Sequence, residues 1–215
     1  MKIRQYHFLK PNRITMVSAC IILVLSVATL SFKYDDKKVN QYYYTSTSEK
    51  DSIVSQKAFL EVYKVLMSPR CMNCHPAGDV PLQGDDSHLH PQGVKRGPGG
   101  KGLYALKCNN CHQAENIYGL NMPPGARDWH LPPSNMRMVF QGRSPHDLAT
   151  QLKNRKQNGN KSFHDLIEHM NTDLVKWAWE PGEGRSIPPL SYSEFVNQLK
   201  LWIDKGAIVP QRGTN

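Results

Sequence analysis

Apolar positions recur every three or four residues in the stretch between Ser48 and Pro69. The apolar members of this stretch are Ile53, Val54, Phe59, Val62, Val65 and Leu66. This spacing predicts an amphipathic helix, because such positions share one face of a helix. Ser48, followed by Asp51 three residues later, is typical of the N-terminus of a helix.

Three further helices are predicted in the C-terminal third, each introduced by a serine that can cap it. Ser144 precedes a proline and an acid, and its helix is expected to end near Asn158. Ser162 introduces a helix expected to run to about Trp179. Ser191 introduces the last helix, which should end at a glycine. The apolar side of this last helix holds Phe195, Val196, Leu199, Trp202 and Ile203.

The remaining segments predict long loops and no strands. Residues 76–102 and 119–145 are rich in Gly and Pro, and a short helix is expected at about 102–111. No run alternates polar and apolar positions convincingly. The predicted fold class is therefore all-α with long loops. Loops of this length without structure of their own usually wrap something.

The N-terminus has the order of an export signal. Residues 1–13 are basic, and residues 14–30 are uncharged and mostly apolar. This order predicts a signal peptide or a signal anchor that leaves the chain from about residue 31 onward outside. Residues 31–48 read as a polar linker, and residues 49–215 as the folded domain. The sequence leaves open whether the signal is cleaved, or lipidated at Cys20.

The net charge of +9 first suggests a nucleic-acid partner. Residues 1–30 carry four of these cations and no acid, and without them 23 Lys and Arg stand against 18 Asp and Glu. The remaining cations are scattered, whereas nucleic-acid binding favours a basic stripe interleaved with aromatics. The pattern therefore argues against nucleic acid as a partner.

Two Cys-x-x-Cys-His motifs carry the most specific chemistry in the chain. Their members are Cys71, Cys74 and His75, and Cys108, Cys111 and His112. On a helical turn, positions i, i+3 and i+4 share a face. Two thiols can then bind the two vinyl groups of one haem, and the histidine can bind its iron. This is the attachment signature of haem c, so two covalent haem c groups are expected.

Zinc is the main alternative cofactor. Two Cys-x-x-Cys pairs can supply the four thiolates of a tetrahedral zinc site. That reading leaves both following histidines without a role, and it fits poorly with export. Because an exported chain with two complete motifs suits haem c better, haem is the preferred interpretation.

With these motifs the chain resembles the c-type cytochromes. Asn121-Met122-Pro123-Pro124 resembles their Met-Pro element, and the closing helix YSEFVNQLKLWIDKGA is also similar. More narrowly, the stretch from NMPPGARDWHLPP through MVFQGRS to PGEGR and WIDKGA is similar to small bacterial proteins described as a subunit of isoquinoline 1-oxidoreductase, a molybdenum hydroxylase. This likeness covers most of residues 70–210. The resemblance implies cytochrome c-like helices with long loops. Because the motifs start only 37 residues apart, we expect one fold around two closely packed haems.

The second axial ligand of each iron is less well defined. Met122 is expected to bind the first iron, because its distance from His75 along the chain allows a longer path around a macrocycle. His90 lies between the motifs and is a candidate for either iron. His130 is a further candidate. A haem with two histidine ligands has a lower potential than one with histidine and methionine.

The expected function is a periplasmic, membrane-tethered di-haem cytochrome that carries single electrons. The resemblance implies a dehydrogenase or molybdenum hydroxylase as one redox partner, with the respiratory chain beyond. Such a chain is an electron carrier more than an enzyme. A di-haem peroxidase and a haem-based gas sensor are the alternatives, and both need one iron with an open position. The expected location is the bacterial inner membrane facing the periplasm, or the periplasm itself if the signal is cleaved.

Overall fold

The computed structural model describes residues 49–213. The predicted export signal at residues 14–30 and the linker at 31–48 lie outside the described residues. Within residues 49–213, no helix combines the length and the apolar character that a membrane crossing requires. The described residues belong to one compact unit of the chain, which begins at Thr47.

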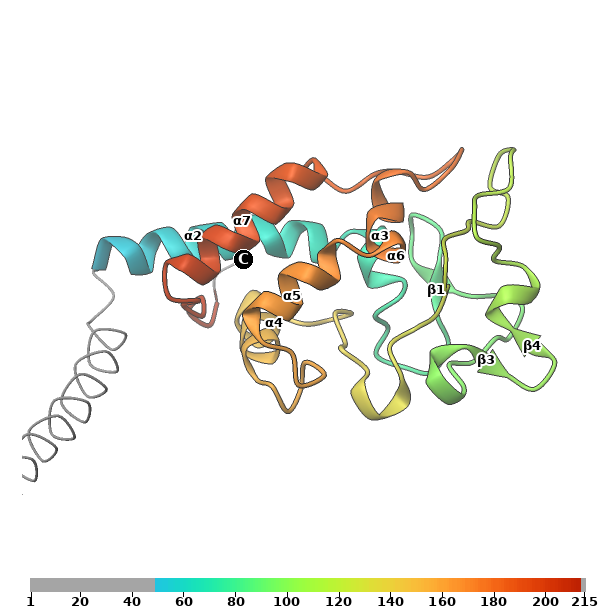
Figure 1. Ribbon diagram of the computed structural model, residues 1–215, viewed down its shortest axis with the longest axis horizontal. Coiled ribbons are helices and arrows are strands. Elements are labelled where there is room, and N and C mark those ends of the chain that lie inside the picture. The colour runs from blue at the N-terminus through green and yellow to red at the C-terminus, as the bar shows by residue number, and fades with distance from the viewer. Residues whose placement is uncertain (1–48, 214–215) are drawn as a thin grey trace, which may run out of the picture. The chain divides into compact units, whose positions relative to one another are not determined.

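Six α-helices occur in the described residues, and most of the core lies among four of them. They are α2 (Glu49–Leu66), α3 (Pro69–Met72), α4 (Pro145–Lys153), α5 (Phe163–Met170), α6 (Asp173–Lys176) and α7 (Tyr192–Asp204). Short 3₁₀ turns occur at Pro98–Gly100, Cys108–Asn110, Ser134–Met136 and Trp177–Trp179. In Figure 1, α2 and α7 cross side by side, while the hairpins and long loops lie at the other end of this unit.

The core forms where α7 packs on α2. Phe59 and Trp202 are fully buried, with ring centroids 4.8 Å apart. Leu148 and Leu152 of α4 and Leu166 of α5 complete the same cluster. Apolar burial of this kind is the main stabilising contribution to a fold. It gives the loops that carry the two motifs a rigid base.

Serine caps begin the predicted helices as expected. The side chains of Ser144, Ser162 and Ser191 each accept a hydrogen bond from the backbone N–H three residues later. The helix predicted from Ser162 to Trp179 is instead divided into α5, α6 and the last 3₁₀ turn. The division falls at Asn171 and Thr172, where α5 ends.

The expectation of an all-α fold with cytochrome c-like helices is wrong. Two antiparallel hairpins occur within the described residues, namely β1 (Leu82–Gln83) with β2 (His88–Leu89) and β3 (Gly102–Leu103) with β4 (Leu106–Lys107). Leu82 pairs with Leu89, and Gly102 pairs with Lys107. Each strand has two residues, which is too short for an alternating pattern to be recognised.

The short helix expected at about 102–111 is replaced by the second hairpin and a 3₁₀ turn. Gly102 has φ +89° and Tyr104 has φ +49°, both in the left-handed region. A right-handed helix cannot contain two such residues. The chain therefore reverses between β3 and β4 and reaches Cys108 as the first residue of the turn.

Candidate functional site

The first motif begins on α3 and continues as one helical turn. Cys71 belongs to the helix, and Cys74 N–H donates to the Cys71 carbonyl over 3.2 Å. His75 N–H donates to the Met72 carbonyl over 2.9 Å. The motif therefore has the local helical geometry that brings positions i, i+3 and i+4 to one face.

The imidazole of His75 is fixed by two contacts from a distant loop. Its Nδ1 lies 2.6 Å from the Met138 carbonyl, and its ring stacks on Phe140 with centroids 3.9 Å apart. A carbonyl can only accept, so Nδ1 carries the proton and Nε2 keeps its lone pair. Burial lowers the pKa of His75 to about 3, which keeps the ring neutral. A neutral imidazole with a free Nε2 is a metal ligand.

The second motif repeats this arrangement with different residues. His112 N–H donates to the Cys108 carbonyl over 2.9 Å. His112 Nδ1 lies 2.7 Å from the Pro124 carbonyl, and its ring stacks on Trp129 with centroids 4.4 Å apart and planes 5° apart. Burial again lowers the pKa of His112. Both motif histidines are thus held by Nδ1 and leave Nε2 available.

None of the four motif thiols forms a disulfide bond. Burial raises the pKa of Cys71 to about 12 and that of Cys74 to about 11. Repulsion from the thiolate form of Cys108 adds to the rise in the pKa of Cys74, so the two motifs lie near one another. In the described part of the chain, no three His, Cys, Asp or Glu side chains form a group able to hold a metal ion.

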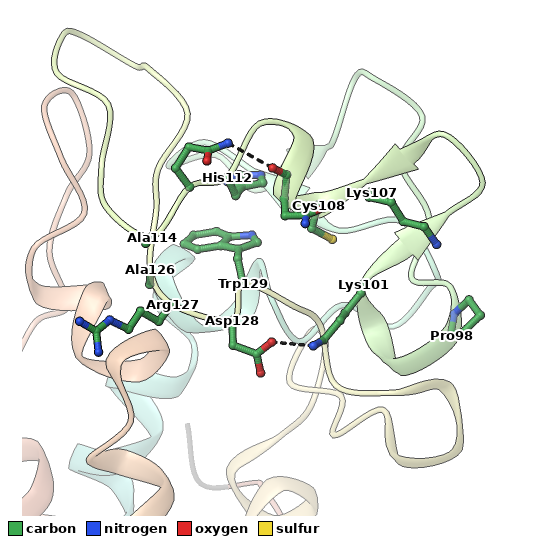
Figure 2. A pocket seen from close by; sticks show the side chains of 12 residues that line it. Pro98, Lys101, Lys107, Cys108, His112, Ala114, Ala126, Arg127, Asp128 and Trp129 are labelled. Atoms are coloured by element: carbon green, nitrogen blue, oxygen red, sulfur yellow. Dashed lines mark hydrogen bonds and ion pairs between the residues drawn. The ribbon is translucent and has the colours of Figure 1, made fainter.

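A cavity of about 730 Å³ lies beside the second motif. Cys108 and His112 line it, and Figure 2 shows the Trp129 indole lying along the His112 ring. The volume falls within the range of about 300–1,000 Å³ that is usual for cofactor sites. Its other lining side chains include three cations, Lys101, Lys107 and Arg127. Lys101 forms a 2.6 Å ion pair with Asp128 at the same cavity.

The candidate second ligands differ sharply in their surroundings. The His90 ring centroid lies 6.3 Å from that of His112, and its Nδ1 is buried without a hydrogen-bond partner. Met122 is 39% exposed, and its side chain lies against Gly119. His130 bonds through Nδ1 to the Asp128 carbonyl. The structure therefore brings His90 to a motif and leaves Met122 near the surface.

The two aromatic residues that stack on the motif histidines, Phe140 and Trp129, were not predicted from the sequence. Phe140 lies 65 residues from His75 in the sequence, and no local spacing links Trp129 to His112. His169 of α5 lies close enough to contribute to the low pKa of His75. Both stacking aromatics lie in the Pro- and Gly-rich segment 119–145, which is the sequence feature that could have indicated them.

Two buried arginines hold the loops around the motifs. Arg96 is 1% exposed, and its guanidinium donates to the carbonyls of Pro132 and Gly78. Arg70, next to Cys71, forms a 2.5 Å ion pair with Asp85. Because a buried charge is costly unless it is paired and hydrogen-bonded, these contacts fix the loops in place.

Comparison with family models, with curated proteins and with solved structures finds no match to this chain. The site is best described by its own geometry. It consists of two thiol pairs, each followed by a histidine held at Nδ1 by a backbone carbonyl and stacked on an aromatic ring.

Proposed function

We propose that this chain is a di-haem c-type electron carrier. One observation carries the proposal: both motif histidines have Nδ1 bonded to a carbonyl, over 2.6 Å at His75 and 2.7 Å at His112. A bond from the other ring nitrogen orients a metal-binding imidazole and makes it more basic. Two separate motifs share this arrangement, which supports the same role for both.

The thiols of each motif provide the attachment. Each thiol would add across one vinyl group of a haem, forming a C–S bond while the thiol hydrogen passes to the other vinyl carbon. No atom leaves, and no oxidant is needed. Cys71 and Cys74 would hold one haem, and Cys108 and Cys111 the other. His75 and His112 would each supply one axial nitrogen.

The residues around the second motif fit a haem. The porphyrin supplies four nitrogens to the iron, so the protein needs only axial ligands and no cluster of three. The three cations of the cavity, Lys101, Lys107 and Arg127, suit the two propionates of the macrocycle. The buried Nδ1 of His90 has no hydrogen-bond partner in the protein, so it could bind an added group.

When bound, haem iron supplies the redox chemistry by taking up and releasing one electron. The protein sets the axial ligands, the burial and the orientation. The partial burial of both motif histidines supports a role in electron transfer, because low polarity around an iron bound there would tune its potential. Transient redox partners use small interfaces. We propose a dehydrogenase or molybdenum hydroxylase as the donor, and the respiratory chain as the acceptor.

The proposed location is the periplasmic side of the bacterial inner membrane, or the periplasm after cleavage. It rests on the basic and apolar order of residues 1–30. Export also brings the four thiols to the compartment in which bacteria attach haem c.

The test is a potentiometric titration of the full chain, produced in bacteria together with the haem c attachment system. We expect two reversible one-electron waves. The double variant Cys108→Ala/Cys111→Ala should keep one wave only. Asn109→Ala, at an exposed position between the same two cysteines, is the matched control and should keep both. A wild-type chain with no haem absorbance would refute the proposal.

A further inference from the structure

The histidines of the described residues differ in how their ring nitrogens are satisfied. His75 and His112 bond to carbonyls, and His88 bonds to Asp86 over 2.6 Å. His146 bonds to the Pro210 carbonyl over 2.8 Å. Among the buried side-chain nitrogens and oxygens without a partner, the one histidine atom is Nδ1 of His90. A buried polar atom without a partner requires an explanation, and a missing ligand is one.

The backbone holds His90 firmly in this position. Its N–H donates to the Pro81 carbonyl over 3.0 Å, just after β2 pairs with β1. The β1 strand is in turn tied to the first motif, because Leu82 N–H donates to the Asn73 carbonyl over 3.0 Å. His90 is therefore positioned by a hairpin that is hydrogen-bonded to the first motif.

The distance between His90 and His112 matches the spacing of two imidazoles on one metal ion. Metal–imidazole bonds are about 2.0 Å long, so two rings on opposite sides of one ion place their centroids about 6 Å apart. The measured separation is 6.3 Å. The ring planes are 66° apart, and two planes that share the nitrogen–metal–nitrogen axis can adopt that angle.

We infer that His90 is the second axial ligand of the iron held by His112. This inference rests on the proposed function, since it needs a haem attached to Cys108 and Cys111. It assigns His90 to the second motif, where the sequence left both motifs open. An iron with two imidazoles has no open position, so this site would pass electrons and would not bind peroxide or a diatomic gas. Its potential would also be lower than that of a His/Met haem.

The experiment compares three variants of the full chain after haem attachment. His90→Ala removes the proposed ligand, and His90→Met replaces it with a thioether. His88→Ala is the matched control, because it lies two residues away in the same hairpin and its ring is exposed and bonded to Asp86. The readouts are haem count by mass, spin state by electron paramagnetic resonance, and potential. The probe for an open position is added imidazole.

We expect two low-spin haems in the wild type and in His88→Ala. In His90→Ala, one haem should become high-spin, and added imidazole should restore it. In His90→Met, one potential should rise and the other should stay unchanged. Two low-spin haems with unchanged potentials in both His90 variants would overturn the inference and leave the proposed function standing. If His90→Ala fails to fold, an unshifted pair of potentials in His90→Met overturns it equally. A wild type without haem would overturn both.

Discussion

The motif histidines show how much of the site could be predicted at the scale of single residues. The local spacing of five residues in each motif predicts a role for four thiols and two histidines, and this stays a prediction. Phe140 and Trp129 were not predicted, because their contacts join segments that only the fold brings together. His90 was one candidate among several until its distance to His112 was known. Met122 was favoured by its sequence context, but its loop is partly exposed.

Gly100 links the loop that precedes β3 to the second motif. Its carbonyl accepts from the Leu131 N–H over 3.0 Å and from the Cys108 thiol over 3.7 Å. Its φ is +76°, and a Cβ at this position would lie 1.7 Å from the Leu131 carbonyl oxygen. A side chain here must therefore displace the backbone that shapes the cavity.

We expect Gly100→Ala to destabilise the protein more than Gly99→Ala. Gly99 has φ +61° but open space around its Cβ position, so its substitution should cost only the left-handed strain of about 1–2 kcal/mol. Gly100→Ala adds a backbone clash to the same strain. Urea denaturation measures both free energies of unfolding. Equal losses in the two variants would contradict the close approach of Gly100 to Leu131.

At the scale of elements, caps and periodicity predicted the long helices well. Ser144, Ser162 and Ser191 begin helices because each side chain satisfies a backbone N–H that the helix leaves free. The two hairpins were not predicted, because strands of two residues are too short to show an alternating pattern of polar and apolar positions. The turns contain residues in the left-handed conformation, such as Tyr104. Glycine is the residue that most clearly indicates this conformation in a sequence.

The packing of α2 on α7 includes a buried polar contact at Ser55. Its hydroxyl donates to the Trp202 carbonyl over 2.9 Å and accepts from the Ile208 N–H over 3.0 Å. Ser55 is fully buried. The chain after α7 is thus tied back to α2 by one side chain.

Ser55→Ala should lower the free energy of unfolding by about 1–3 kcal/mol, because it leaves the partly buried Ile208 N–H without an acceptor. Ser52→Ala, one turn earlier on α2 and not fully buried, should change it by less than about 0.5 kcal/mol. Thermal or urea unfolding distinguishes the two. A Ser55 variant as stable as the Ser52 variant would show that water replaces the hydroxyl.

At the scale of the whole molecule, the two proposed haems would lower the net positive charge of the folded domain. Outside residues 1–30, Lys and Arg exceed Asp and Glu by 23 to 18. Two haems would add four propionates, which brings the exported part close to neutrality. Basic side chains that line the cavity, such as Lys107, would then face the propionates of the proposed cofactor. The charge gives no support to a polyanion partner.

The central claim is that each Cys-x-x-Cys-His motif holds one covalent haem, and denaturing mass spectrometry of the purified full chain tests it most directly. Thioether bonds survive unfolding, whereas haem or zinc held only by coordination is lost. We expect the mass of the wild-type chain to be increased by two haems. The mass of the Cys108→Ala/Cys111→Ala chain should be increased by one haem. An unmodified chain mass, with zinc found in the native protein, would contradict the claim.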